Sequence, residues 1–241
     1  MRAALHAEWT KLRTVPEAAV LLLLTVVLTV GVSVTAAAFG GIDRVYVSLL
    51  GVQLGQAVVA AWGVQILAGE FGTGLARATV TAIPRRLTVL AAKATLLLAG
   101  VLAAAVVSVG VSVLAGRALI DGYPATGTGT LLRAAGGAVA YLLLMALLGL
   151  GAAAILRGAV TATGVVLGLL YLGPAILNFF IDPDWQRFLY RIMPGTAGQA
   201  VMSTVDLGTL PIRPISGLIV AAIWSFVTLG IGAAVFCARD V

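Results

Sequence analysis

Charged side chains gather in one stretch of an otherwise apolar chain, GEFGTGLARATVTAIPRRLTVLAAK at residues 69–93. The stretch lies between two apolar runs and combines one carboxylate with four cations. The five residues are Glu70, Arg77, Arg85, Arg86 and Lys93. Such cations could pair with acidic groups on a partner protein or with lipid phosphates. We therefore interpret the stretch as a candidate binding surface, with an ordinary positively charged membrane loop as the alternative.

The apolar runs carry few groups that could support catalysis. An enzyme that works within the membrane needs paired carboxylates, metal ligands or an activated nucleophile at membrane depth. The only charged side chain inside the runs is Lys93, whose long stem could carry its charge to the interface. Neither Lys11 nor Lys93 follows a glycine, so the phosphate-binding motif G-x-x-x-x-G-K-[ST] is absent from the sequence. With one histidine, His6, and one cysteine, Cys237, we expect no metal site, no cofactor held by this chain and no enzymatic activity.

Composition indicates the class of protein. The chain has 241 residues, of which 61% are hydrophobic and 10% charged, and its mean hydropathy is +1.11. Continuous apolar runs long enough to cross a hydrocarbon core of about 30 Å recur along it, whereas a membrane barrel would show shorter, alternating segments. We therefore expect an all-α polytopic membrane protein. The net charge of +6 does not indicate nucleic-acid binding, because the basic residues stand singly or in pairs at the ends of the apolar runs.

Six apolar runs predict six transmembrane helices in one domain over residues 17–241. A helix of about 22 residues is about 33 Å long, which is enough to cross a membrane with some tilt. The predicted spans lie near 18–39, 45–69, 89–116, 134–156, 159–181 and 215–237. The loop 70–88 then joins the second span to the third, and the segment 182–214 joins the fifth to the sixth.

Residues 1–16, MRAALHAEWTKLRTVP, predict an amphipathic helix that lies at the membrane interface. Leu5, Trp9 and Leu12 share one helical face, and the basic residues lie off that face. Pro16 would end this helix.

The segment 182–214 is too long for a simple turn and opens with residues that start helices. Asp182 is placed to cap a helix, and Pro183 to occupy its first position. Apolar residues then recur at helical spacing, and they are Trp185, Phe188, Leu189 and Ile192. We expect a short external amphipathic helix that contacts membrane lipid.

The distribution of basic residues predicts the orientation in the membrane. Three basic residues precede the first apolar run, and Arg44 alone follows it. Cytoplasmic loops are the ones enriched in lysine and arginine, so the N-terminus should be cytoplasmic. Six spans then return the C-terminus to the cytoplasm, make 70–88 a cytoplasmic loop and leave 182–214 outside.

Uncharged polar residues inside the apolar runs allow two interpretations. Gln53 and Gln56 share a helical face of the second run, and Asn178 lies near the outer end of the fifth. These side chains could line a translocation path. They could instead form hydrogen bonds between helices, which is the interpretation that we favour.

Two pairs of glycines have the spacing of closely packed membrane helices. The pairs are Gly51 with Gly55 and Gly164 with Gly168. Small residues four apart let two helix backbones approach each other, either within one bundle or across a dimer face.

Two motifs together resemble the permease subunits of ABC-2 type ABC transporters, in their short, alanine-, valine- and leucine-rich forms from GC-rich bacteria. The first is AEWTKLRT before the first span, and the second is the stretch 62–93, which contains GEFGTGLARATVTAIPRRLTVLAAK. The architecture is similar along the whole chain. The resemblance implies six spans, an interfacial N-terminal helix, a cytoplasmic coupling helix between spans two and three, and an external segment that dips into the membrane between spans five and six.

The resemblance also implies partners and roles. Two permease chains, forming a homodimer, would join two separate ATPase subunits, which bind ATP and Mg²⁺, in an exporter of the bacterial plasma membrane. The coupling region would contain Glu70, Phe71, Arg77, Pro84, Arg85 and Arg86, and 182–203 would be the dipping segment. The family often has Glu-Tyr followed by a basic residue where this chain has Glu70, Phe71 and Gly72. An apolar path without fixed charges favours an amphiphilic drug, lipid or peptide as substrate. The alternative is a membrane module that binds or assembles another membrane protein without transport.

Overall fold

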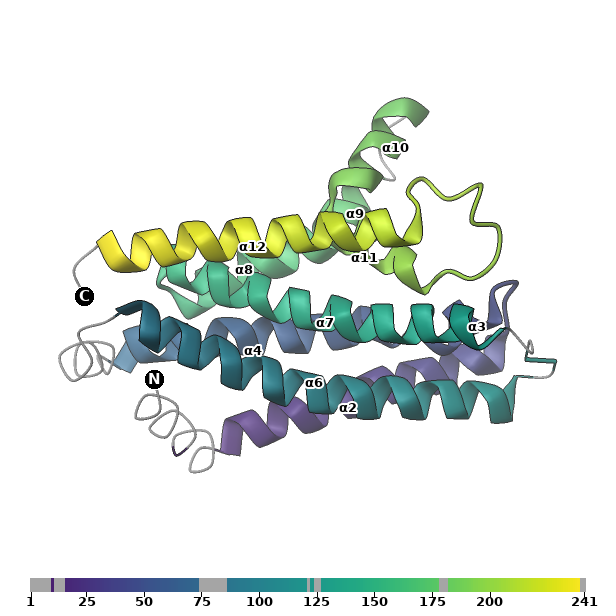
Figure 1. Ribbon diagram of the computed structural model, residues 1–241, viewed down its shortest axis with the longest axis horizontal. Coiled ribbons are helices and arrows are strands. Elements are labelled where there is room, and N and C mark those ends of the chain that lie inside the picture. The colour runs from purple at the N-terminus through teal and green to yellow at the C-terminus, as the bar shows by residue number, and fades with distance from the viewer. Residues whose placement is uncertain are drawn as a thin grey trace.

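The regular elements of the chain are helices throughout the part that the structure describes (Figure 1). This computed structural model describes residues 10, 16–73, 86–120, 122–123, 127–177 and 182–238. Six helical segments are long and apolar enough to cross a membrane. The all-α class and the six apolar helices are therefore confirmed.

The six candidate membrane spans in the described residues are mostly single helices, with one exception. The fifth is assembled from an α-helix, a π-helical turn and a second short α-helix. The spans are α2 (Pro16–Phe39), α4 (Val52–Thr73), α6 (Arg86–Leu119), α7 (Thr128–Leu156), α8 (Ala159–Leu167) continued by η1 (Gly168–Leu172) and α9 (Gly173–Leu177), and α12 (Pro214–Ala238). The first residues of α2 and the last of α12 lie at the same end of the bundle (Figure 1).

The second apolar run is not one helix from residue 45, as its composition predicts. It begins with the short helix α3 (Arg44–Ser48), which Asp43 caps by accepting a hydrogen bond from the Tyr46 N–H at 3.0 Å. A turn follows, and its Gly51 N–H donates to the Ser33 hydroxyl of α2 at 3.1 Å. A Cβ on Gly51 would collide with the backbone carbonyl of Thr29. The glycine is therefore needed where the turn lies against α2.

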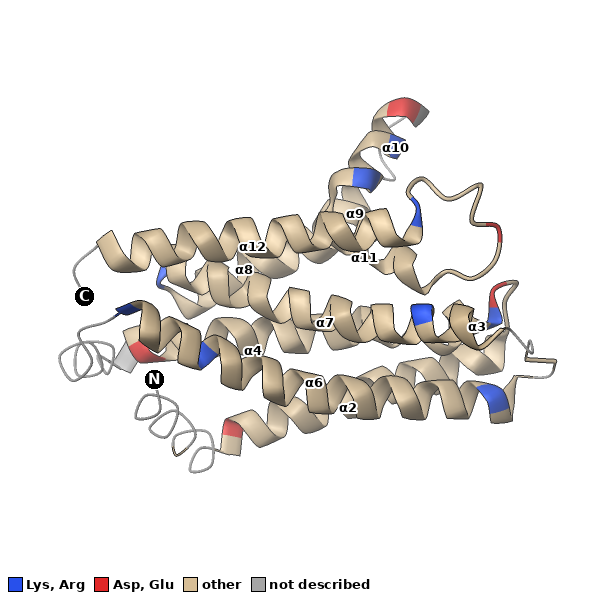
Figure 2. Cartoon of the chain, in the orientation of Figure 1, with Lys and Arg blue, Asp and Glu red and all other residues tan. Residues whose placement is uncertain are grey.

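The helices on either side of the predicted loop 70–88 are longer than their apolar runs. Because α4 runs to Thr73 and α6 starts at Arg86, the connection shortens to residues 74–85, which lie outside the described residues. Glu70 and Phe71 are consequently helical. At 34 residues, α6 is about 50 Å long and exceeds a hydrocarbon core of about 30 Å. Most of the charged residues lie near the two ends of the bundle or on α10 (Figure 2).

The helix α7 forms the centre of the bundle and packs against α4, α6, α8 and α12. In its most apolar window 67% of the residues are buried, against 17% in α12 and in the fifth span. The closest approach is to α4, where a Cβ on Gly63 would collide with the Ala146 carbonyl and one on Gly149 with the Ala60 carbonyl. The outer helices expose apolar side chains such as Leu23, which is the surface that lipid requires.

The segment between the fifth and sixth spans leaves the bundle and returns to it. The helix α10 (Pro183–Ile192) projects from the side of the bundle (Figure 1). It is followed by α11 (Pro194–Gln199) and the 3-10 turn η2 (Ala200–Met202), which pack against α7 and α12. Pro194 and Gly195 therefore begin a second, buried helix, in addition to ending the first.

The predicted N-terminal helix over 1–16 lies outside the described residues, apart from Thr10 and Pro16. Pro16 is the first residue of α2. This position suits proline, because the first N–H groups of a helix have no acceptor within it.

Candidate functional site

A buried ion pair lies at the base of the 74–85 connection. Lys93 Nζ is 2.7 Å from Glu70 Oε1 and donates a second hydrogen bond to the Ile66 carbonyl at 3.0 Å. The Lys93 side chain is only 1% exposed. The expectation that its charge reaches the interface is therefore wrong. Because α4 continues through Glu70, the carboxylate faces α6 and holds the ammonium inside the bundle.

Phe71 joins three helices at the same end. Its ring lies 6.2 Å from the ring of Phe236 in α12, at an interplanar angle of 72°. The guanidinium carbon of Arg157 lies 5.5 Å from the Phe71 ring centre, within the range of a cation–π contact. Arg157 ends α7 in a left-handed conformation with φ of 56°. The side chain expected to contact a partner is thus half-buried against the bundle.

Arg86 binds the C-terminus of α12. Its Nη1 donates to the carbonyls of Phe236 and Cys237, both at 3.2 Å. The last carbonyls of a helix lack partners within the helix, and a cation satisfies both their hydrogen bonds and the helix dipole. We call the resulting group of contacts the loop-end cluster. It consists of Glu70, Phe71, Arg86, Lys93, Arg157 and Phe236, drawn from α4, α6, α12 and the end of α7.

The structure brings Glu70, Phe71 and Arg86 of the predicted coupling region into this cluster. Arg77, Pro84 and Arg85 lie outside the described residues. Lys93 and Arg157 were not assigned to the coupling region by sequence reasoning. For Lys93, the one available signal was that a charged residue within an apolar run needs a nearby partner.

A second polar group lies in the middle of the bundle. The hydroxyl of Tyr141, which is fully buried in α7, donates to the side-chain oxygen of Gln56 and also lies 3.3 Å from the Gly195 carbonyl. Gln199 Nε2 donates to the same Gln56 oxygen at 3.4 Å. Gln56 therefore joins α4, α7 and the returning helix α11, as expected of a hydrogen bond between helices.

The second glutamine, Gln53, faces a pocket. Its Nε2 donates to the Tyr46 hydroxyl at 3.3 Å, and its backbone carbonyl accepts from the hydroxyl of Tyr171 in η1. The pocket lies between α2, α4 and η1, has a volume of about 390 Å³, and is apolar apart from Gln53, Tyr171 and Thr35. Single π-helical turns occur frequently at functional sites. Asn178, the third residue of the predicted path, lies outside the described residues.

The helix α10 has its apolar face exposed. Trp185 is 58% exposed and Phe188 52%, and their rings meet edge to face at 6.0 Å. Ile192 is also exposed and Leu189 is half-buried. The base of α10 is attached to the bundle, because Trp224 Nε1 of α12 donates to the Ile192 carbonyl at 2.7 Å.

Two charged residues hold the chain where it leaves the returning segment. The Asp43 carboxylate accepts from the backbone N–H of Thr204 at 2.5 Å and from its hydroxyl at 2.6 Å. Arg133 donates to the carbonyls of Val201 and Ser203 at 2.9 and 2.8 Å. Sequence reasoning missed both contacts, because they join residues at least 68 positions apart.

The comparison with protein-family models finds no match, and no curated protein matches the sequence significantly. Within the described residues, no three His, Cys, Asp or Glu side chains come together in a group that could hold a metal ion. A functional assignment therefore depends on the residues and contacts described above.

Proposed function

We propose that this chain is the membrane-spanning subunit of an ATP-driven exporter of the ABC-2 type, and that it moves an amphiphilic substrate out of a bacterial cell. Two copies would form a dimer, with both termini of each in the cytoplasm. A separate ATPase would bind ATP and Mg²⁺ and press on the connection 74–85. The chain itself would carry out no hydrolysis.

The loop-end cluster is the observation that carries this proposal. A displacement of the connection 74–85 acts first on Thr73 and Arg86, the residues that border it. Glu70 and Lys93 tie α4 to α6, while Phe71 and Arg86 tie both helices to α12. Short, partly buried contacts of this kind move as a unit, since a packed interior has low compressibility. A push on the connection would therefore shift α4, α6 and α12 together.

The pocket at Gln53 supports an amphiphilic substrate. Its apolar walls suit a hydrocarbon or aromatic body, and Gln53 with Tyr171 would hold a polar group at one point. Gln56 lies one helical turn away and belongs to the contacts that hold α11. In this proposal Gln53 therefore lines the path, Gln56 positions the external segment, and α10 rests in the outer leaflet with Trp185 and Phe188 in lipid.

Charge reversal in the connection tests the proposal. The chain would be purified from its own host, the co-purified ATPase identified, and the complex reconstituted in liposomes that report ATP hydrolysis and export of a fluorescent amphiphile. Reversing Arg77 and Arg85 to Glu should lower ATPase affinity about tenfold, because two attractive pairs become repulsive. The matched control is Arg117→Glu, an exposed cation in the last turn of α6 at the opposite end of the bundle.

The control should retain both ATPase binding and export. Equal ATPase binding by the parent, the Arg77 and Arg85 reversal variant and the control would exclude the connection as the docking element. Failure of any ATP-binding subunit to co-purify, together with absence of export, would favour the assembly-module alternative.

A further inference from the structure

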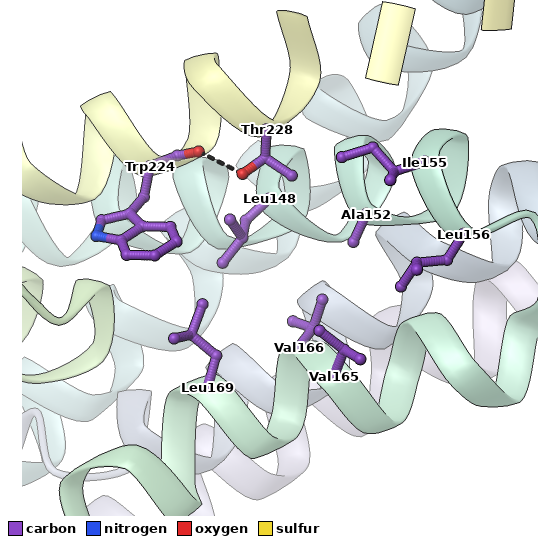
Figure 3. Close-up of a pocket in the computed structure, with 9 residues that line it drawn as sticks. All are labelled: Leu148, Ala152, Ile155, Leu156, Val165, Val166, Leu169, Trp224 and Thr228. Atoms are coloured by element: carbon purple, nitrogen blue, oxygen red, sulfur yellow. Dashed lines mark hydrogen bonds between the residues drawn. The ribbon is translucent and has the colours of Figure 1, made fainter. Parts of the chain in front are cut away.

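The function proposed above leaves one groove unassigned. It lies between α7, α8 and α12 and has a volume of about 220 Å³ (Figure 3). Side chains from these elements point into a common space, with Ala152 of α7 on one side and Val166 of α8 and Leu169 of η1 on the other. The lining of α7 runs from Leu148 to Leu156, which is about 12 Å along the helix axis. The groove is therefore elongated along the bundle.

Both side-chain hydrogen-bond donors in the wall of this groove are already used. The only hydroxyl in the lining, that of Thr228, donates to the Trp224 carbonyl at 2.7 Å (Figure 3). The indole N–H of Trp224 donates to the Ile192 carbonyl, which leaves the ring itself to form the wall. An apolar cavity of about 150 Å³ stays dry and binds a hydrocarbon such as benzene. Water is therefore a poor occupant of this larger, equally apolar space.

The position of the groove identifies a better occupant. It opens between two predicted spans, α8 and α12, whose neighbouring side chains are exposed and apolar. Val165 is 54% exposed and Val227 53%. A second protein helix, about 10 Å across with its side chains, is too wide for 220 Å³, whereas a polymethylene chain is narrow and flexible.

We propose that the α7–α8–α12 groove binds one acyl chain of a membrane phospholipid. The chain enters from the surrounding bilayer and lies against Ala152, Val166 and the Trp224 ring. This site does not depend on the proposed transport function, and its test requires no ATPase. Failure of the exporter proposal would leave it standing, and the reverse also holds.

Trp224 provides the reporter for the test. A variant with Trp9, Trp62 and Trp185 changed to Phe keeps Trp224 alone. This variant, purified in detergent, would be titrated with phosphatidylglycerol that carries brominated acyl chains, which quench indole fluorescence on contact. We expect quenching that saturates at about one lipid per chain.

Two variants in the same background fill the groove, and a third variant serves as a matched control. Ala152→Leu adds volume from α7, and Val165→Phe adds it from an exposed position that leaves the bundle core intact. Each should raise the half-saturating lipid concentration about tenfold, the effect of losing burial for about two methylene groups. The control Val106→Phe adds an aromatic ring to an exposed position of α6 outside the groove lining and should change nothing.

Quenching that rises linearly with lipid and ignores Ala152→Leu and Val165→Phe would overturn the proposal. A second result would also overturn it. If the brominated lipid never quenches Trp224, and the protein is a dimer that Val165→Phe dissociates, the groove is a protein interface.

Discussion

Removing the buried cation Lys93 should destabilise the bundle strongly. In the Lys93→Met variant a side chain of similar length replaces the ammonium that lies 2.7 Å from Glu70 Oε1. Breaking a fully buried ion pair by deleting one partner costs about 3–5 kcal/mol, since the other charge stays in a low-dielectric site. Glu70 keeps 12% exposure and so retains some solvation. We expect a loss of about 3 kcal/mol, which lowers the folding equilibrium constant about 100-fold.

A double variant separates the charge effect from the packing effect. Glu70→Gln with Lys93→Met removes both charges and leaves two neutral side chains of similar shape. Replacing a buried ion pair by neutral groups is often nearly neutral for stability. The double variant should therefore be more stable than Lys93→Met alone, by about 2 kcal/mol.

Reversible unfolding in mixed micelles with increasing sodium dodecyl sulfate, followed by circular dichroism, gives the free energies. Arg117→Met is the matched control, since it removes an exposed cation from the other end of α6 and should stay within about 0.5 kcal/mol of the parent. A stability loss below about 1 kcal/mol in Lys93→Met would refute the assignment of a buried, coupled pair. So would a loss in the double variant equal to the losses of Lys93→Met and Glu70→Gln added together.

Three further predictions concern packing and hydrogen bonds. Gly63→Ala drives a methyl group into the α7 backbone and should lower stability by about 2 kcal/mol. Gly164→Ala meets no atom within 4 Å and should be neutral or stabilising by up to about 1 kcal/mol. Thermal melting in detergent distinguishes the two variants, and equal melting temperatures would contradict the close approach of α4 to α7. Tyr141→Phe leaves the Gln56 oxygen without one donor and should cost about 1–3 kcal/mol in the same assay; an unchanged melting temperature would show that this hydrogen bond contributes nothing. Asp43→Asn weakens the hold on residues 204–205, so their amides should exchange with deuterium faster, about tenfold for a loss of about 1.4 kcal/mol; unaltered exchange would exclude a holding role for this carboxylate.

The sequence by itself determined the helical class, the six apolar helices and the residue at which α10 begins. A segment in lipid must satisfy its backbone hydrogen bonds internally, so a long apolar run can only become a helix. Helix starts are equally local. Asp182 accepts from the Asp184 N–H at 2.9 Å, and Pro183 fills the first turn, as the residues alone predicted.

Only the tertiary structure decided which polar side chains meet. Lys93 looked like a residue that reaches water, but the length of α4 and its rotation against α6 bring Glu70 to it. The close contact at Gly63 and Gly149 sets how α4 lies on α7, and it thereby places Gln56 beside Tyr141. An apolar run is a property of neighbouring residues, which hydropathy records. The partner of a buried polar group depends on the rotation and depth of two packed helices, which no local pattern contains.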